Sequence, residues 1–383
     1  MMRAGIVIAT VILIATAVAI FSFVSNISDA FVSVTDEVAL KGIPKASRSG
    51  MFEVAWQLDL QPRAVSSMTV TPQGWPGDLA VLPAGDTIHI LRRDGTAVRT
   101  IDAPDNTEWI GGDPTGAIPF LVAVSRDYRI GLDRLVKTSF VHALDVSGRV
   151  LWTRTYAANR MQPGLTASLA TSGGMPVILV VSGTELICLD VQGRALWTRP
   201  FQRASHLNRF TGVVNGQEPE YAAVSLAARE RMAIEQNGRR LEIPWSGYSF
   251  RLLAAGALFP GGPTEVALSR HYNRTGGGTG VALTFVQLPF GTTYETATDG
   301  DAAPVAIEPF DTDADGMAVW LSASTDGSLR VIPAAAPSEL VEYTGARFQY
   351  MAMIPGNPPV IVAATHRGLA AWRPSTALIG RYE

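Results

Sequence analysis

The chain carries short runs of β-branched and other apolar residues, separated by turns rich in Gly, Pro, Asp and Asn. Runs of this length are typical of β-strands, and the residues between them are those that close hairpins. Seven such runs recur along the chain, at residues 78–82, 120–125, 177–182, 221–225, 265–269, 317–322 and 360–365. We interpret each run as the strand that opens one unit of an all-β fold.

One hairpin of these units is repeated almost unchanged. Residues 145–154 read Asp-Val-Ser-Gly-Arg-Val-Leu-Trp-Thr-Arg, and residues 190–199 read Asp-Val-Gln-Gly-Arg-Ala-Leu-Trp-Thr-Arg. The two copies are 45 residues apart (190 − 145), which is typical of one blade of a β-propeller or one unit of a solenoid. In each copy the glycine permits the positive φ of a tight turn, and the Trp that follows is expected to anchor the packing.

The pattern favours a seven-bladed β-propeller over residues 51–383. Closing the units into a ring removes the exposed sheet edges that an open stack would leave. The segment 53–60, around Trp56, resembles the strands around Trp152 and Trp197, whereas the last unit ends soon after Trp372. We therefore expect the N-terminal strand to complete the seventh blade. A β-sandwich, or two separate β-domains, is the alternative.

The N-terminal segment is predicted to be a transmembrane helix spanning residues 1–25. Residues 4–24 form an apolar run of 21 residues (24 − 4 + 1) without a charge, long enough to cross a bilayer. A cleaved signal peptide is the alternative. Arg3 precedes the run and the first charges after it are acidic, so the positive-inside rule places the N-terminus in the cytoplasm and the rest of the chain outside it.

A stalk over residues 26–50 follows the span and is expected to be partly helical. One face of this helix would carry four apolar residues, Ile27, Phe31, Val34 and Val38. Gly42 and Pro44 would end it. The stripe is a candidate contact with a neighbouring membrane protein. Alternatively, it packs on the chain's own globular domain or lies in the lipid interface.

Composition and motifs exclude some classes of function. The chain is 47% hydrophobic and 17% charged, with a net charge of −3, so the basic stripe of a nucleic-acid-binding protein is missing. Cys188 is the only cysteine and lies inside an apolar run, which predicts a buried core residue. The histidines never fall at metal-ligand spacing, and no nucleophile elbow, phosphate-binding loop or His-Glu-x-x-His motif is present. We therefore predict that the protein is not an enzyme.

The repeated phrase, an apolar strand followed by Ala-Leu-Asp-x-x-Gly-x-x-Leu-Trp, resembles the quinoprotein-type (PQQ-like) propeller repeat. The loops 112–116 and 311–316 are similar to the FG-GAP or VCBS repeat. The likeness covers roughly residues 52–373, and it implies a scaffold rather than an activity. The quinoprotein dehydrogenases have a larger propeller and commonly an adjacent cysteine pair, which this chain lacks, so no organic cofactor is expected.

One acidic loop is a candidate metal site. Asp311, Asp313 and Asp315 occupy alternate positions before Gly316, an arrangement that suits Ca²⁺. The ninth and twelfth positions are Val319 and Ser322, so the further carboxylate ligands of such loops are missing. The alternative is a solvated turn in which the Asp side chains accept hydrogen bonds from local main-chain N–H groups.

The second unit holds an insertion, residues 126–137, that is a candidate binding loop. It mixes four basic residues with apolar ones, and Tyr128 and Arg129 are the types favoured at interface anchors. An ordinary solvated loop is the alternative. Trp75 and Trp109 are expected in loops outside the repeat, where each is either a partner contact or a plug beneath a loop.

These features predict a non-catalytic scaffolding or accessory subunit of a bacterial membrane protein complex. The chain would span the inner membrane once, hold its C-terminal propeller in the periplasm, and contact the other subunits and the bilayer but no nucleic acid. The propeller subunit that scaffolds outer-membrane protein assembly is a functional analogue, although it is lipid-anchored. The alternative is a periplasmic ligand-binding propeller, a sensor or carbohydrate-binding module that Ca²⁺ would assist.

Overall fold

The computed structural model divides the chain into two compact units, residues 1–44 and 45–383. It describes residues 50–383 apart from the segments 60–64, 84, 131–134, 159–165, 173–174, 183–184, 201–206, 216–217, 228–230, 237–238, 245–248, 260–261, 263, 274–278, 289–291, 299–301, 313–315, 334–339, 366–367 and 380–383. The predicted span and stalk lie outside the described residues. No helix within the described part is long and apolar enough to cross a membrane.

The described strands form seven antiparallel sheets of four strands, which we number 1 to 7 in chain order of their innermost strands. The innermost strands are β2 (Val65–Val70), β6 (Thr107–Gly111), β10 (Thr166–Ser172), β14 (Leu207–Asn215), β18 (Ser249–Ala257), β22 (Pro304–Asp311) and β26 (Phe348–Ile354). The second strands are β3 (Leu79–Pro83), β7 (Leu121–Ile130), β11 (Met175–Ser182), β15 (Glu218–Ala227), β19 (Thr264–Asn273), β23 (Ala318–Ser324) and β27 (Val360–Thr365).

The outer half of each sheet consists of its third and fourth strands. The third strands are β4 (Thr87–Leu91), β8 (Leu135–Leu144), β12 (Glu185–Leu189), β16 (Arg231–Gln236), β20 (Thr279–Leu288), β24 (Ser328–Ile332) and β28 (Gly368–Pro374). The outermost strands are β5 (Ala97–Asp102), β9 (Val150–Ala158), β13 (Ala195–Pro200), β17 (Arg239–Pro244), β21 (Thr292–Thr298), β25 (Leu340–Tyr343) and β1 (Phe52–Leu58). A short helix, α2 (Thr376–Ile379), follows sheet 7 and buries Leu378.

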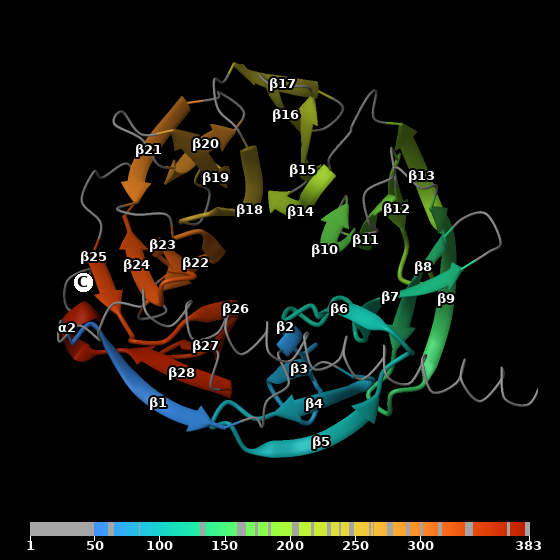
Figure 1. Ribbon diagram of the computed structural model, residues 1–383, viewed down its shortest axis with the longest axis horizontal. Coiled ribbons are helices and arrows are strands. Elements are labelled where there is room, and N and C mark those ends of the chain that lie inside the picture. Colours follow the sequence, from blue (N-terminus) through green and yellow to red (C-terminus); the bar gives the residue numbers. More distant parts are fainter. Residues whose placement is uncertain are drawn as a thin grey trace, which may run out of the picture. The chain divides into compact units, whose positions relative to one another are not determined.

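The sheets of the second unit are arranged in a closed circle. Figure 1 shows the innermost strands facing the centre and the outermost strands at the rim. Each innermost strand contacts the innermost strand of the next sheet, and β26 of sheet 7 contacts β2 of sheet 1. This is the arrangement of a β-propeller, so the predicted all-β class is confirmed.

Strand β1, the first described strand, pairs with β28, the last. It is the outermost strand of sheet 7, and in this pairing Val54 lies opposite Trp372 and Trp56 opposite Ala371. The main-chain N–H groups of Met51 and Phe52 both donate to Oε2 of Glu342 on β25, at 2.8 and 3.1 Å. Strand β1 is therefore bonded to sheet 6 as well as to sheet 7.

The seven runs interpreted as opening strands are the second strands of their sheets, and this part of the sequence interpretation was wrong. A second strand has a neighbouring strand on each side and a sheet on each face, so the residues that pack between the sheets are mostly apolar. Every residue of β27 is buried. The innermost strands mix buried and half-buried residues, as β22 does. Their hydrophobic pattern is weaker, and the sequence analysis therefore missed them.

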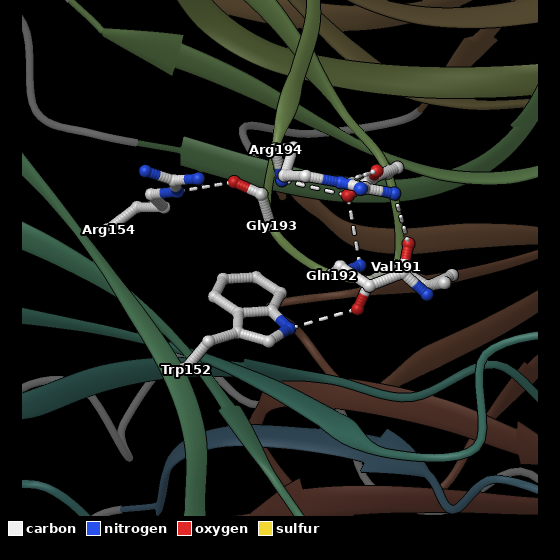
Figure 2. Close-up of polar contacts among 7 residues, drawn as sticks. Trp152, Arg154, Val191, Gln192, Gly193 and Arg194 are labelled. Atoms are coloured by element: carbon white, nitrogen blue, oxygen red, sulfur yellow. Dashed lines mark hydrogen bonds and ion pairs between the residues drawn. The ribbon is translucent and has the colours of Figure 1, made fainter.

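The repeated hairpin joins neighbouring sheets. In sheet 3 the turn before β13 is closed by Asp190, whose carboxylate accepts hydrogen bonds from the N–H groups of Gln192 and Arg194 and from Nε of Arg194, at 3.0, 2.8 and 2.7 Å. Trp152, on β9 of sheet 2, lies against Gly193 of this turn, and its Nε1 donates to the carbonyl of Val191 at 2.9 Å (Figure 2). The Trp thus anchors packing, as predicted, but across a sheet boundary.

Trp56 makes the same contact between the last sheet and the first. Its Nε1 donates to the carbonyl of Arg93 at 2.7 Å, and its ring lies against Gly95 in the turn of sheet 1. Gly95 and Gly193 both have positive φ, 83° and 75°, which only glycine adopts without strain. Strand β1 is therefore also bonded to sheet 1.

Candidate protein-interaction surface

The connections between strands lie on two faces of the ring. Because neighbouring strands in each sheet are antiparallel, successive connections alternate between these faces. Connections from first to second and from third to fourth strands lie on what we call the first face. Connections from second to third strands lie on the second face.

An extension of sheet 2 projects from the second face. The pairing of β7 with β8 continues through five further pairs, from Arg126↔Ser139 to Ile130↔Leu135. In sheet 3 the equivalent hairpin ends at Ser182↔Glu185, which corresponds to Ser125↔Phe140. At ~3.4 Å a residue the extension is about 17 Å long. We call residues 126–130, 135–139 and 156–158, the last from β9, the arm.

Of the residues predicted to bind a partner, the two that belong to the ring domain lie in the arm. Tyr128 pairs with Lys137 and Arg129 with Val136. The described parts of the insertion, residues 126–130 and 135–137, are thus strands rather than a loop, and for them the interpretation as a loop was wrong. On β7, Tyr128 and Ile130 alternate with the polar residues Asp127 and Arg129, which is typical of a strand.

The base of the arm is fixed to the ring. His142 on β8 is buried, with its Nε2 2.8 Å from the Ser125 hydroxyl and its Nδ1 3.0 Å from the Thr153 hydroxyl. Burial lowers the pKa of His142, so its imidazole is neutral at pH 7. The side chain therefore acts as a structural link across the sheet. Arg126, at the foot of the arm, forms an ion pair with Glu108 on β6.

Two adjoining pockets lie on the first face where sheets 7, 1 and 2 meet. The inner pocket, about 350 Å³, is lined by the connections after β2, β6 and β26 and includes Trp75 and Pro355. The outer pocket, about 450 Å³, includes Trp56 and Arg93. Arg93 bonds residues of the inner pocket, through its main-chain N–H to Asp78 Oδ2 at 2.7 Å and through Nη1 to the Pro355 carbonyl at 3.3 Å. We call the two pockets together the first-face groove.

The two tryptophans left open by the sequence lie in different settings. Trp75 lies in the connection after β2, and its Nε1 donates to the carbonyl of Pro119 in sheet 2 at 3.1 Å. It is half-buried and lines the groove. Trp109 lies on the innermost strand β6 and packs against the core between sheets 2 and 3. Trp109 is therefore a core residue, whereas Trp75 is available at the surface.

The acidic loop is described only in part. Oδ2 of Asp311 accepts a hydrogen bond from the N–H of Gly316 at 2.9 Å, which is the contact expected of a side chain that caps its own turn. Asp313 and Asp315 lie outside the described residues. Within the described part, no three His, Cys, Asp or Glu side chains are grouped so as to hold a metal ion.

Two further predictions concern the N-terminal stripe and the cysteine. The stripe, Ile27, Phe31, Val34 and Val38, lies outside the described residues. Cys188 is fully buried in sheet 3, and burial raises the pKa of its thiol to about 11. Its predicted place in the core is confirmed, and the thiol is unreactive at neutral pH.

These features define a β-propeller repeat protein with a fixed arm on one face and a groove on the other. Searches found no match among protein-family models or curated proteins. Among solved structures, the chain is similar to BamB from Moraxella catarrhalis, with 14% identity over 86% of this chain and 92% of that chain and a TM-score of 0.50.

Two further solved structures are similar. BBS1N, determined in complex with ARL6DN, has 10% identity over 88% of this chain and 99% of that chain, with a TM-score of 0.60. The WD40 β-propeller domain of Doa1 has 10% identity over 85% of this chain and 98% of that chain, with a TM-score of 0.54. At such identities the likeness shows the propeller fold alone.

Proposed function

We propose that the protein is a non-catalytic scaffolding subunit of a bacterial membrane protein complex. Its ring would be a seven-bladed propeller that binds other subunits. Two of the similar propellers support a role in protein interaction, because BBS1N was determined in complex with ARL6DN and the Doa1 domain belongs to the WD40 class. The seven described sheets and the contact between β26 and β2 support the number of blades.

The arm is the observation that carries this proposal. A hairpin of this length is not required in every sheet, since the equivalent hairpin of sheet 3 ends five pairs earlier. A projection about 17 Å long, with a base tied to the ring by His142 and Arg126, offers a rigid surface to a partner. Rigid elements lose little conformational entropy on binding.

The proposed location is the periplasmic side of the inner membrane. Residues 1–25 would span the membrane with the N-terminus in the cytoplasm, and residues 26–50 would form the stalk. The apolar run and the charges that flank it support this orientation. On this proposal the stripe Ile27, Phe31, Val34 and Val38 contacts a neighbouring membrane protein.

We also propose that the repeat is of the quinoprotein (PQQ-like) type with FG-GAP-like loops. The contacts of Trp152 with Val191 and Gly193, repeated by Trp56 with Arg93 and Gly95, support a common repeat. In sheet 1 the corresponding outer-strand position is Arg99, and Gly148 of sheet 2 lies against Ile101 instead. The repeat has therefore diverged in the first sheet.

The experiment that tests the proposal shortens the arm. Residues 126–139 are replaced by Gly-Thr, the connection that the chain itself uses at 183–184 between Ser182 and Glu185. The wild type and the variant are extracted from membranes in mild detergent after brief crosslinking, and proteins that co-purify are identified. We expect the variant to fold and to lose at least one partner that the wild type retains.

A matched control shortens the hairpin of sheet 5. Strands β19 and β20 also pair over ten residues each, and their connection is on the same second face. Shortening this hairpin should leave the partner bound to the arm in place. If both shortened proteins keep all partners of the wild type, or if the wild type has none, the scaffold proposal is wrong.

A ligand-binding propeller is the second candidate, because an aromatic side chain, Trp75, lines a pocket on the first face. A carbohydrate ligand assisted by Ca²⁺ at Asp311, Asp313 and Asp315 would be its form. Calorimetric titration with Ca²⁺, then with oligosaccharides, tests it. Two results would favour this candidate over the scaffold. One is Ca²⁺ binding that Asp311→Asn abolishes, and the other is sugar binding that Trp75→Ala abolishes.

A further inference from the structure

Each of the two pockets of the first-face groove is lined by an indole, and Arg93 connects the pockets. Trp75 lines the inner pocket and Trp56 the outer one, and Arg93 joins the two through its bonds to Asp78 and Pro355. Prolines contribute to both pockets: Pro72, Pro114 and Pro355 to the inner one, and Pro358 to the outer one. The groove therefore runs across the boundary between sheets 7 and 1.

The indoles offer only their apolar surfaces to a ligand. The Nε1 of Trp75 already donates to Pro119 and that of Trp56 to Arg93, at 3.1 and 2.7 Å. Val54, beside Trp56 in the outer pocket, is 57% exposed. A ligand that contacts the two indoles must therefore do so with apolar groups.

Two side chains of the groove, Gln73 and Arg93, keep hydrogen-bond donors that a ligand can use. The Thr71 hydroxyl donates to Gly77 at 2.5 Å, and that of Thr115 donates to Asp113 at 2.7 Å. The exposed side-chain amide of Gln73 has no hydrogen-bond partner among the described residues. The Arg93 guanidinium donates one of its five N–H groups to the Pro355 carbonyl. The Gln73 amide and the Arg93 guanidinium are therefore both suited to donate to carbonyl oxygens of a ligand.

The charges of the groove are balanced. Two positively charged side chains, Arg93 and Arg373, and two negatively charged ones, Asp78 and Asp94, line the two pockets. The Arg373 guanidinium is also paired with Glu53 at 3.0 Å, and Asp94 accepts the N–H of Thr96 at 2.9 Å. A ligand with a net charge of its own gains little here.

We propose that the first-face groove binds an uncharged, proline-rich extended segment of a partner protein. Such a segment, in the polyproline II conformation, packs its rings on aromatic side chains and has carbonyl oxygens but few N–H groups. These properties match the apolar indole surfaces and the free donors of Gln73 and Arg93. The inference deepens the proposed scaffold function by naming the kind of segment recognised on the first face.

A sugar fits the same groove less well. Sugar hydroxyls are donors as well as acceptors, and they need side-chain hydroxyls, indole N–H groups and carboxylates that are free to bond. In the groove, the Thr71 and Thr115 hydroxyls and both indole N–H groups are used within the protein. Satisfying the hydroxyls of a sugar would break these bonds.

Calorimetry with three blocked eight-residue peptides tests the proposal on the full-length protein in detergent. The peptides are octaproline, a Gly-Ser repeat and an octaproline with two central Glu residues. We expect octaproline to bind at least tenfold more tightly than the Gly-Ser peptide, and the Glu residues to give no gain. The double variant Gln73→Ala, Arg93→Ala should weaken octaproline binding by a factor of ten or more.

The control pair, Gln192→Ala and Arg99→Ala, removes an amide and a guanidinium from exposed sites outside the groove and should leave binding unchanged. Equal binding of octaproline and the Gly-Ser peptide would overturn the proposal, as would wild-type affinity in the groove variant. Tighter binding of the Glu peptide or of maltohexaose would overturn it in favour of an acidic or a sugar ligand. Since the arm is intact in these variants, the crosslinking result for the scaffold proposal is independent.

Discussion

At the scale of single residues, the glycine turns and the Trp residues that lie on them hold neighbouring sheets together. The sequence predicts that Gly193 takes a positive φ and that Trp152 anchors packing. It does not predict that the two are in contact, because they belong to different repeats, 41 positions apart (193 − 152). The contact arises only when sheets 2 and 3 pack side by side in the ring, with the turn of sheet 3 against the indole of sheet 2 (Figure 2).

A pair of glycine substitutions separates backbone strain from this contact. Gly193 and Gly74 have φ of 75° and 87°, but a Cβ on Gly193 would lie 2.8 Å from the Trp152 ring whereas one on Gly74 has nothing within 4 Å. Both Ala variants are expected to lose about 1–2 kcal/mol through the left-handed backbone. Gly193→Ala should lose a further 1–3 kcal/mol through displacement of the indole. Urea unfolding measures both, and equal losses would contradict the contact.

The hydrogen bond of the indole can be tested by itself. Trp152→Phe keeps an aromatic ring but removes the donor to the Val191 carbonyl. We expect a loss of roughly 1–3 kcal/mol, from the hydrogen bond and the smaller ring. Trp109→Phe is the control, because Trp109 packs in the core of sheets 2 and 3. The loss at position 152 should fall when Gly193→Ala is already present, since the two changes disturb one contact.

Glu308, on the innermost strand β22, gives a prediction that depends on pH. Burial raises its pKa from 4.5 to about 7, so the folded protein binds this proton more tightly than the unfolded chain. The contribution of Glu308 to the free energy of unfolding is therefore highest below pH 4.5, falls as the pH rises from 4.5 to 7, and is constant above 7. Glu308→Gln should raise the stability by about 2–3 kcal/mol at pH 8 and by little at pH 4. A gain that is the same at both values would show that ionisation is not its cause.

At the scale of strands and sheets, the sequence shows the second strands and hides the innermost ones. The run 360–365 is apolar up to Thr365 because β27 is buried along its whole length. β22, with the half-buried residues Val305, Ala306 and Glu308, carries a mixed pattern. The extra residues between two strands of the second unit predict an insertion at 126–137, but the pairing of Tyr128 with Lys137 is fixed by no local pattern.

Strand β1 is the element on which the stability of the ring is expected to depend most. It is bonded to sheet 6 through Glu342, to sheet 7 through β28 and to sheet 1 through Trp56. A protein that begins at residue 50 should unfold at the same temperature as residues 45–383. A protein that begins at residue 60 should lose cooperative unfolding. The removal of β1 leaves β28 as an open sheet edge and Glu342 buried without the main-chain N–H groups of Met51 and Phe52.

Glu342→Gln is a milder change to the same strand. It replaces the carboxylate that accepts the N–H groups of Met51 and Phe52 with a neutral amide. We expect a loss of about 1–2 kcal/mol, since hydrogen bonds to charged groups are the stronger ones. Thermal unfolding measures it, with Glu53→Gln, which changes an exposed ion pair with Arg373, as the control. A larger loss at Glu53 would contradict the importance of Glu342.

At the scale of the whole molecule, a ring with two different faces is proposed to be joined to a membrane anchor. The repeat of 45 residues predicts the ring, and the apolar run 4–24 predicts the anchor. The groove could not be predicted, because it is built by connections from sheets 7, 1 and 2 that lie far apart in the sequence. A local pattern reports which side chains a segment has, not which other loops lie beside it.

The anchor gives a prediction for the intact cell. The chain should fractionate with the inner membrane, resist extraction by carbonate and dissolve in mild detergent, because a helical span is held by its apolar surface. Protease added to the periplasm should reach the ring domain. The N-terminus of the mature protein should lie before residue 4. Mature protein that begins after residue 24 would instead indicate a cleaved signal peptide.

The central claim is that the protein works as a subunit held by other proteins. Blue-native electrophoresis of the crosslinked, detergent-extracted wild type, beside the variant with Gly-Thr in place of residues 126–139, tests it most directly. The account predicts a band well above the mass of one chain for the wild type, and a shift of that band towards the single chain for the variant. Migration of the wild type as a single chain, at every salt concentration tried, would contradict it.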